Sequence, residues 1–544
     1  MWITQPLKSE QGMAALIALI MVTMLTLLGV AALQTSDDEV SIAGNELHET
    51  RSFYAAEAGL EQAAAAIQTE YDHTGLPPTT MPSGSSSING ASVVFNTVDR
   101  GPASQRTLVN GSLAGLHALV KSFDITSTAQ TPNEPGKVSL SQSFETALIP
   151  LYQFAVFYGQ DLEIAPGEDM QLVGRVHSNA DMYLQSNIAL RMDSYTTAAG
   201  SIYYGRKGPG GAGAGDVLLK NGAGNYVSMK MGAGWLDHKY SKWYDSSIGR
   251  WNGRMQDKAH GQSSLNLPLT NSTDAHKIIE PATGNSDSYE NQASLKIVDN
   301  KAYQKVAGVW VDVTLTMTTL GIITYTADKF TDQREGKKID CTDLDIQKLY
   351  ANGYGPSNGI LYFSDNIATG SEFPGLRLKN GSTLDAPLTV ASANPIYTVG
   401  NFNSVNKKPA SLMADAITYL SGAWDDAKST LAKGNRVATP TIVNASYMTG
   451  NVGTTNTVYS GGFENLPRFL ETWSGKDFTW YGSAVCMWNS RQSTGGWNGT
   501  YYDPPNRRWY YDIDLDDPAK LPPGTPVVRV FQRTGWQEQY VGAN

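Results

Sequence analysis

The sequence MAALIALIMVTMLTLLGVAAL, residues 13–33, decides how this chain begins to fold. It contains no charged residue, and a helix of about 20 apolar residues is long enough to span the hydrocarbon core of a bilayer. The preceding stretch, MWITQPLKSEQG, has one lysine and lacks the basic region of an ordinary secretory signal. The segment therefore predicts a retained membrane helix, and secretory cleavage after Ala31 or Ala32 is the weaker alternative.

The same helix is expected to continue into the polar sequence that follows. Residues 34–71 are rich in helix-forming residues, and the first proline is Pro77, so we expect the helix to reach about Gln68. Apolar residues recur there at spacings of three or four, which predicts one apolar stripe. The stripe consists of Val40, Ala43, Leu47, Tyr54, Ala58 and Ile67.

The composition of the whole chain favours a folded, mainly β protein. The 544 residues exceed what one core usually organises, so two or more domains are expected beyond the membrane segment. With 53 Gly, 27 Tyr and only 17% charged residues, the chain suits turn-rich β structure. The formal net charge of −10 disfavours nucleic acid as a partner, because phosphate binding needs clustered Lys and Arg.

The pattern of short strands divides the chain beyond the helix. Rung-like runs separated by Gly, Asn or Pro predict a head resembling a β-solenoid or parallel β-helix, interrupted by an inserted β-rich segment that begins with GRKGPGGAGAGD. The predicted units are residues 1–12, a leader; 13–75, the helix; 76–150, a linker and small β subdomain; 151–203, the first solenoid-like part; 204–345, the insertion; and 346–544, the second solenoid-like part with an aromatic-rich C-terminal region.

The N-terminus resembles a known family. A polar leader ending in Gly12 and followed by MAALIALIMV resembles a type IV prepilin signal, and RSFYAAEAGLEQA, residues 51–63, resembles the N-terminal domain of PilX-type minor pilins. The resemblance covers residues 1 to about 70. It implies a pilin-like stem, cleavage after Gly12 by a prepilin peptidase, and methylation of the new N-terminus at Met13. Residues 152–544 without the insertion resemble an uncharacterised domain often found behind such N-termini.

The resemblance also assigns the apolar helix to filament packing, through residues such as Leu16, Ile17, Leu19 and Leu25. Ile17 is the fifth residue after the predicted cleavage site, where major pilins carry a glutamate thought to neutralise a neighbouring N-terminal amine. A subunit without this carboxylate cannot provide that partner in an apolar filament core. This difference favours a tip or low-copy subunit over a shaft subunit. An unprocessed single-pass anchor is the alternative.

The head shows no strong pattern for catalysis. None of the seven histidines has HExxH spacing and no Cys-x-x-Cys accompanies them, so we expect no enzyme and no zinc site. His177 in GRVHSNADMYL is interpreted as part of a structural turn. Asp512, Asp514 and Asp516, followed by Asp517, form a weak calcium candidate, and solvated loop carboxylates are the preferred interpretation. No other cofactor is expected.

Two further features allow two interpretations each. Cys341 and Cys486 are the two cysteines, and whether they form a long-range disulfide depends on geometry that the sequence does not give. Six tryptophans lie between Trp473 and Trp536, and core packing is preferred over ligand stacking.

The leading functional hypothesis is a minor pilin-like component of a type IV pilus, at or near the filament tip, in assembly priming or surface adhesion. The alternatives are a large tip pseudopilin of a type II secretion system and, less favoured, a membrane-anchored catalytic ectodomain. The expected partners are other major and minor pilins, the inner-membrane assembly machinery with its prepilin peptidase, and a surface receptor or glycan. The chain would lie in the inner membrane with its head extracytoplasmic, and then in an extracellular filament.

Overall fold

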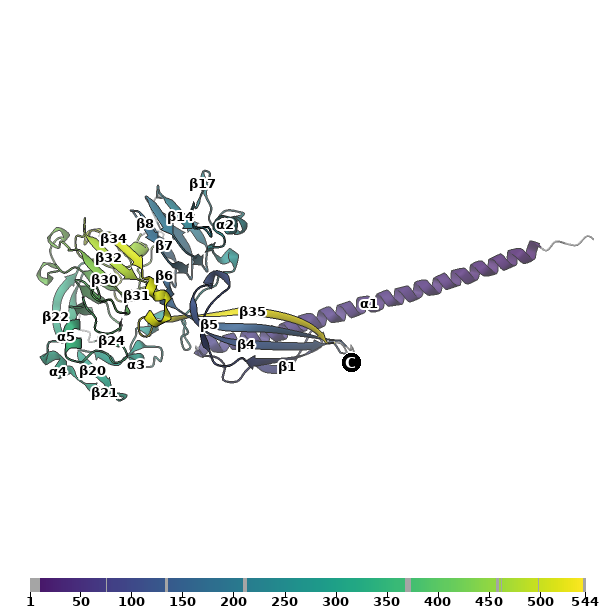
Figure 1. Ribbon diagram of the computed structural model, residues 1–544, viewed down its shortest axis with the longest axis horizontal. Helices are drawn as coiled ribbons and strands as arrows, with labels where there is room; N and C mark the ends of the chain where they lie inside the picture. The colour runs from purple at the N-terminus through teal and green to yellow at the C-terminus, as the bar shows by residue number, and fades with distance from the viewer. Residues whose placement is uncertain are drawn as a thin grey trace, which may run out of the picture.

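The structure is a computed structural model, and it combines one long helix with a β-rich head (Figure 1). It describes residues 10–74, 76–132, 136–208, 213–366, 373–455, 459–460, 462–497 and 499–541. Most of the predicted leader lies outside these residues. The expectation of a mainly β protein with a long N-terminal helix is confirmed.

Helix α1, Glu10–Thr74, is continuous over 65 residues. It lacks proline and ends just before the Pro77–Pro78 pair, a few residues beyond the predicted end. Its first half extends away from the rest of the molecule, and its second half packs against a sheet (Figure 1). A single helix therefore links the apolar N-terminal segment to the folded body.

The face of α1 that packs differs from the predicted stripe. Val40, Leu47 and Tyr54 are exposed, whereas Ile67 alone among the six predicted positions is completely buried. The buried face is instead formed by mostly small residues spaced three or four apart. These are Ser52, Ala55, Ala56, Gly59, Leu60, Ala63, Ala64, Ile67 and Tyr71. The prediction gave weight to large apolar residues, but a sheet packed this closely selects small ones.

The sheet beneath α1 is antiparallel and runs in the order β1-β2-β4-β5-β35, with β3 paired to β4. On β2 buried and exposed residues alternate, so one face of the strand packs on the helix. The strands are β1 (Ser83–Ile88), β2 (Ala91–Asp99), β3 (Ser104–Thr107), β4 (His117–Gln130), β5 (Lys137–Pro150) and β35 (Val527–Val541).

The last strand, β35, pairs along its length with β5, although more than 370 residues separate them in sequence. β35 falls within the predicted second solenoid-like part, because the sequence of a single strand does not show which sheet it joins. The remainder of the head is therefore inserted between two neighbouring strands of the small sheet.

The first part of the head stacks short parallel strands at an offset of about 20 residues. Leu162, Met182 and Ile202 are in register on three successive strands, and all three are completely buried. The stacked sets are β6 (Phe154–Tyr158), β9 (Arg175–Ser178) and β12 (Thr196–Ala198); β7 (Leu162–Ile164), β10 (Met182–Leu184) and β13 (Ile202–Tyr204); and β8 (Met170–Leu172), β11 (Ala189–Met192) and β14 (Asp216–Lys220).

The second part repeats this arrangement with longer returns. Its parallel sets are β24 (Ile360–Ser364), β26 (Leu388–Ser392), β28 (Ala410–Ala414), β31 (Ser446–Thr449) and β33 (Ala484–Cys486); β23 (Lys337–Asp345), β25 (Phe373–Lys379), β27 (Ile396–Val399) and β29 (Ile417–Leu420); and β30 (Thr441–Asn444), β32 (Asp477–Gly482) and β34 (Asn506–Tyr511). Apolar side chains from both parts form one continuous core.

The predicted insertion contains short helices and hairpins as well as strands. These elements are β15 (Tyr226–Ser228), β16 (Lys230–Met231), β17 (Gly234–Trp235), α2 (Trp243–Trp251), β18 (Met255–Gln256), α3 (Tyr289–Gln292), β19 (Leu295–Val298), β20 (Lys301–Val306), β21 (Val309–Asp312), α4 (Thr314–Thr319) and β22 (Ile323–Asp332), with α5 (Ile346–Ala351) after β23. The hairpin of β20 and β21 ends one side of a 12-stranded sheet.

The two parts of the head join where β33, the last strand of its stack, pairs in parallel with β6, the first strand of the other. The chain therefore starts at the middle of the 12-stranded sheet, runs outward to β18, crosses to the far end, and returns to the middle. No sheet of the described residues closes on itself. The finer label of β-solenoid stays a prediction.

The space around Gly59 shows how closely α1 approaches the sheet. A Cβ at this position would overlap the Ser127 hydroxyl and lie 2.7 Å from Val93 Cγ1, whereas a Cβ at Gly44 in the same helix would meet nothing within 4 Å. We expect Gly59→Ala to lower the stability of the small domain by about 1–3 kcal/mol through overpacking. Gly44→Ala should be neutral or stabilising, since alanine favours a helix over glycine.

Thermal unfolding of the detergent-solubilised full chain, followed by circular dichroism, measures both variants. Equal melting temperatures for the two would contradict the close approach of α1 to the sheet.

Candidate functional site

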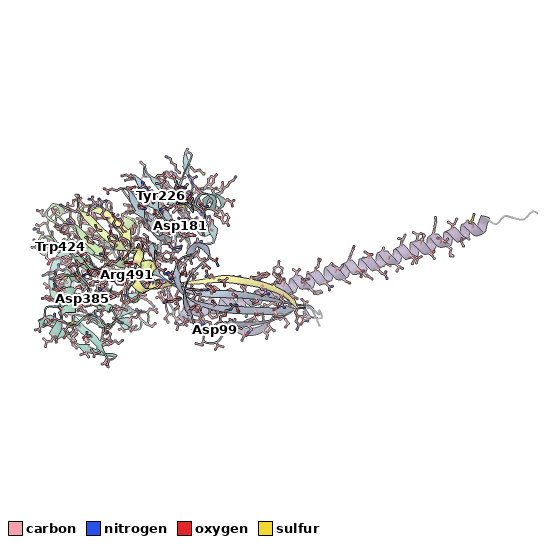
Figure 2. The ribbon with its side chains drawn as sticks, viewed as in Figure 1. Asp99, Asp181, Tyr226, Asp385, Trp424 and Arg491 are labelled. Atoms are coloured by element: carbon pink, nitrogen blue, oxygen red, sulfur yellow. The ribbon has the colours of Figure 1, made fainter. Side chains whose placement is uncertain are left out.

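The largest exposed apolar surface of the molecule is the first half of α1. The residues predicted for filament packing, Leu16, Ile17, Leu19 and Leu25, are between 50% and 67% exposed. In Figure 2 the side chains of this half stand clear of every other element. Burying one such side chain is worth about 1.5–3 kcal/mol. A stem with so many of them is therefore stable only in an apolar environment.

This stem is the one helix in the described residues that is long and apolar enough to cross a membrane. Its hydroxyl groups are satisfied within the helix, since Thr23, Thr26 and Thr35 each donate to the carbonyl four residues earlier, at 2.7, 2.6 and 2.9 Å. Unsatisfied polar groups cost several kcal/mol in a bilayer. The stem is thus chemically compatible with lipid and with the apolar interior of a helical assembly.

Charged contacts hold the second half of α1 to the C-terminal strand. The Arg529 guanidinium pairs with Asp72 and donates to the Tyr71 carbonyl, and Arg533 pairs with Glu61 at 2.6 Å. Both arginines lie on β35, so the end of the chain reaches back to the helix. The stem and the strand that encloses the head are therefore tied together directly.

The aspartates proposed for calcium already have cationic partners. Lys407 Nζ lies 2.8 Å from both Asp512 oxygens and 2.7 Å from Asp514, and Lys520 also pairs with Asp514 at 2.8 Å. Asp516 accepts the Tyr511 hydroxyl at 2.7 Å. The bonds from Lys407 and Lys520 lower the pKa of Asp514 to about 2. The lysines occupy the positions from which a cation would be bound, and calcium binding stays a prediction without support from this geometry.

The two cysteines do not form the disulfide that the sequence left open. Cys341 and Cys486 are free, buried thiols in different hydrophobic clusters. Burial raises the pKa of each thiol, that of Cys486 to about 12, so neither is a nucleophile at neutral pH.

His177 lies in strand β9 beside the predicted turn. Its Nδ1 lies 2.8 Å from the Thr197 hydroxyl and its Nε2 lies 3.0 Å from Asn179 Oδ1, while the ring packs against Phe157. Burial lowers the pKa of His177 to about 4, so the ring is neutral at physiological pH. A buried histidine with two partners has a structural role, as expected.

One group of residues has the spacing of a nucleophile triad. Ser247 Oγ lies 2.7 Å from His260 Nε2, and His260 Nδ1 lies 3.1 Å from Asp257 Oδ1. However, Ser247 is completely buried, and His260 Nδ1 accepts the backbone N–H of Asp257. A substrate therefore cannot reach the Ser247 hydroxyl in this structure. The group caps a turn of helix and joins it to α2.

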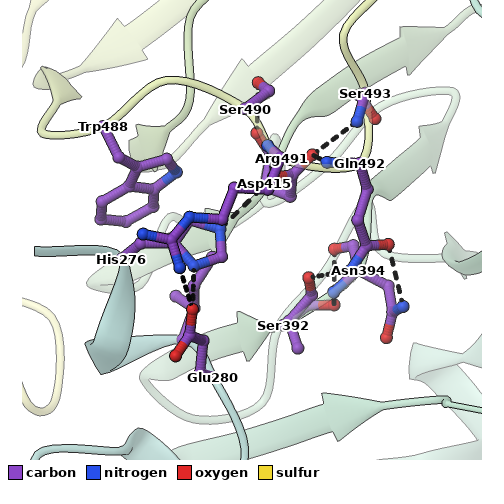
Figure 3. Close-up of polar contacts among 12 residues, drawn as sticks. His276, Glu280, Ser392, Asn394, Asp415, Trp488, Ser490, Arg491, Gln492 and Ser493 are labelled. Atoms are coloured by element: carbon purple, nitrogen blue, oxygen red, sulfur yellow. Dashed lines mark hydrogen bonds and ion pairs between the residues drawn. The ribbon is translucent and has the colours of Figure 1, made fainter. Parts of the chain in front are cut away.

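A second polar cluster centres on Asp415, which lies between β28 and β29 and is completely buried (Figure 3). Its carboxylate accepts the backbone N–H groups of Arg491, Gln492 and Ser493 at 2.6, 3.1 and 2.8 Å. His276 Nε2 lies 3.4 Å from the same carboxylate. Burial raises the pKa of Asp415, but these four partners outweigh it and the pKa is lowered.

An isolated aspartate between the apolar runs of β28 and β29 is a usable sign of this cluster, which the sequence-based predictions did not include. The His276 ring also bonds Glu280 at 2.9 Å and packs edge-on against Trp488. Because Asp415, His276 and the loop at 491–493 come from three distant segments, the cluster holds the insertion against the second stack. The Asp415 carboxylate and both His276 ring nitrogens have partners within the cluster, whereas the buried Trp488 Nε1 has none.

The aromatic residues of the C-terminal region mostly fill the core, as preferred. Trp473, Trp480, Trp488 and Trp509 are buried and pack against other rings. The other two tryptophans of the group, Trp497 and Trp536, are exposed.

Comparison with known proteins gives one match. The family model described as PilX N-terminal matches residues 11–61, which comprise the apolar stem and the beginning of the packed half of α1. No curated protein and no solved structure matches the chain. The predicted PilX-type N-terminal domain is thereby confirmed, and the β-rich head behind it is not assigned by any of these comparisons.

Asp415→Asn should destabilise the head at pH 7, because an amide cannot accept from the same set of N–H donors as a carboxylate. We expect a loss of about 1.5–3 kcal/mol. Since the folded pKa of Asp415 is below its unfolded value, this contribution is complete above about pH 4 and is lost as the pH falls through the folded pKa. The difference between variant and parent should therefore shrink in acid.

Urea unfolding followed by tryptophan fluorescence at pH 7 and at about pH 3 measures this difference. The control is Asp385→Asn, which changes the same charge at an exposed position of the head labelled in Figure 2. If Asp415→Asn were no more destabilising than Asp385→Asn at pH 7, the cluster would not hold the insertion.

Proposed function

Because residues 11–61 form a PilX-type N-terminal domain, we propose that this chain is a minor pilin-like component of a type IV pilus, located at or near the filament tip. The observation that carries the proposal is the division of α1 into a free apolar half and a half packed on an antiparallel sheet. Such a helix can leave a bilayer and enter a bundle of similar helices without changing its own fold. Assembly priming and surface adhesion are the roles proposed for it.

The direction in which the head extends supports the tip position. In Figure 1 the head lies beyond the folded end of α1, on the side opposite the apolar stem. In a filament of parallel stems, a head in this position would occupy the space of the subunit above it. The terminal subunit has no such neighbour.

The residue at position 17 supports the same location. Ile17 offers no carboxylate, so this subunit would leave the N-terminal amine of a neighbouring pilin without its usual partner. A subunit present once per filament incurs this cost once, whereas a shaft subunit would incur it at every repeat.

Before assembly the chain would lie in the inner membrane, with prepilin peptidase and the assembly machinery as partners. In the filament the partners would be other major and minor pilins. The stacked parallel strands of the head support the solenoid interpretation, in which a rigid body is carried outward on the stem. A tip pseudopilin of a type II secretion system is the second candidate, because the same stem and Ile17 suit a short pseudopilus.

A catalytic ectodomain is not favoured. The group with triad spacing has a completely buried Ser247, and the Asp415 carboxylate is completely buried and bonded by backbone N–H groups. Neither presents a reactive group to a substrate.

Immunogold labelling of the native head on sheared surface filaments tests the proposed function. Gold at one end of the filaments is the expected result. Gold along the shaft would overturn the tip position, and gold confined to the cell envelope with normal pili present would favour the secretion-system candidate.

Processing after Gly12 is tested by mass spectrometry of the chain from cells that contain a prepilin peptidase. We expect the parent to lose residues 1–12 and Gly12→Leu to keep them, since a bulky residue should block cleavage. Gly29→Leu is the control, because Gly29 lies in the same helix and has nothing within 4 Å of its Cβ position. An identical mass for the parent and Gly12→Leu would contradict processing at this site.

A further inference from the structure

A cleft of about 480 Å³ opens where the two stacks of the head meet. One wall comes from the β6–β7 region of the first stack, and the other from the loops that follow β31 and β33 of the second stack. The size suits a small polar ligand. Its polar lining includes Gln160, Asp161, Glu163, Lys207, Asn451 and Asn489.

Glu163 is the unusual member of this lining. It lies between Leu162 and Ile164 on β7, both of which point into the core, so its side chain points outward to the cleft. The residue is only 6% exposed, and neither carboxylate oxygen has a hydrogen-bond donor in bonding geometry. Burial raises the pKa of Glu163, and the nearby Thr454 hydroxyl, the backbone N–H of Lys207 and the charges of Arg206 and Lys207 oppose it with smaller effects. A buried acceptor of this kind lacks the donors that stabilise it.

A second carboxylate behind the cleft is half satisfied. Glu464 accepts the backbone N–H of Ala165 through Oε1, but its buried Oε2 has no partner. Burial raises the pKa of Glu464 to about 7. The region therefore holds unfilled acceptor capacity on two carboxylates.

The other polar groups of the cleft differ in their existing partners and in their exposure. Lys207 pairs with Asp161 at 2.5 Å, and its charge also lowers the pKa of Glu163 without a hydrogen bond to that carboxylate. Asn489 is exposed and Asn451 is half-buried, and their side-chain amides line the opening. An amide presents both a donor and an acceptor, so the opening can exchange hydrogen bonds with a ligand in both directions.

Aromatic rings continue from Glu163 along the outer face of the first stack. Tyr183 is in register with Glu163 on the next strand, and Tyr203 is in register with Tyr183 on the one after. The two rings stack with centroids 5.3 Å apart. The row therefore consists of the Glu163 carboxylate on one strand and a stacked tyrosine ring on each of the next two strands. Glu163 and Ala180 line the cleft, and the two rings lie beside it.

These features select one class of ligand. A divalent cation is disfavoured, because the described residues contain no group of three or more His, Cys, Asp or Glu side chains placed to hold a metal ion. Anions are disfavoured by Glu163. A ligand rich in hydroxyl groups supplies the missing donors to the carboxylate, exchanges hydrogen bonds with the amides, and places the apolar face of its rings on tyrosine.

We infer that this cleft, with Glu163 at its base and Tyr183 and Tyr203 beside it, binds a neutral oligosaccharide. The row of in-register groups suits a chain of sugar units rather than a single sugar. The inference deepens the proposed adhesion and rests on it for its biological use, but the binding itself is a property of the head.

The experiment uses the full chain in lipid nanodiscs and three neutral probes: maltotriose, cellotriose and triacetylchitotriose. Saturation-transfer NMR detects binding, and titration gives its strength. We expect at least one trisaccharide to bind with a Kd of about 1 mM or tighter. Glu163→Gln should weaken that binding about tenfold, because a charge-assisted acceptor is lost.

Glu168→Gln is the matched control, since Glu168 is an exposed glutamate after the same strand and is not among the cleft residues. It should leave binding unchanged. Glu163→Gln should not lower the melting temperature, because neither oxygen has a donor to lose. Asn489→Ala is a second variant at an exposed position, where folding is not at risk, and it should also weaken binding.

The absence of binding by all three trisaccharides would overturn the inference, as would binding that Glu163→Gln and Asn489→Ala leave unchanged. Binding of a peptide or of calcium at the same residues, with no binding of any of the three sugars, would assign the cleft to another ligand. Filament labelling fails or succeeds independently of this result, so a failed adhesion site is distinguishable from a failed pilin assignment.

Discussion

The close packing of α1 on the five-strand ladder of the small sheet is the contact on which the rest of this molecule depends. Small side chains at Ala55, Ala56 and Ala63, with Gly59 between them, let the helix approach the strands. The sheet includes β35, the last strand of the chain, so the body is complete only when the head has folded and returned the chain to β5. The stem, the sheet and the head are therefore one linked structure, although their sequences are far apart.

In the head, two sheet edges are covered where the two stacks meet. The first stack grows outward from β6 and the second grows inward to β33, and the two strands pair where the stacks meet. This pairing covers two edges that would otherwise expose unpaired backbone groups. It also creates a junction whose two walls come from distant segments, and at the cleft in this junction the buried Glu163 carboxylate, which has no hydrogen-bond donor, lies beside an opening.

Buried charge in the rest of the head is used differently. Arg377 pairs with Asp343 at 2.6 Å, and Arg468 pairs with Glu335 at 2.6 Å, with all four side chains almost completely buried. Arg377 and Asp343 are in register on the neighbouring strands β25 and β23, whereas the Arg468–Glu335 pair, like the Asp415 cluster, joins segments far apart in sequence. Each charge has a close partner, as buried ions require. Glu163 differs from these pairs, because neither oxygen of its buried carboxylate has a hydrogen-bond partner.

The apolar stem, the continuous helix and the β-rich character of the head can be read directly from the amino-acid sequence. A charge-free run of about 20 residues, the absence of proline up to Pro77, and the spacing of turn residues are local properties that a sequence displays directly. It also carried the PilX-type resemblance at residues 11–61, which lies within this same helix.

The folded structure was needed to show which face of α1 packs, which sheet β35 joins, and that Lys407 and Lys520 pair with the aspartates after β34. It also decided that Glu163, in an ordinary short strand, is buried without a donor. Most of these outcomes depend on contacts between segments that are far apart in the sequence, such as α1 with β35, and such contacts leave no local pattern in either partner.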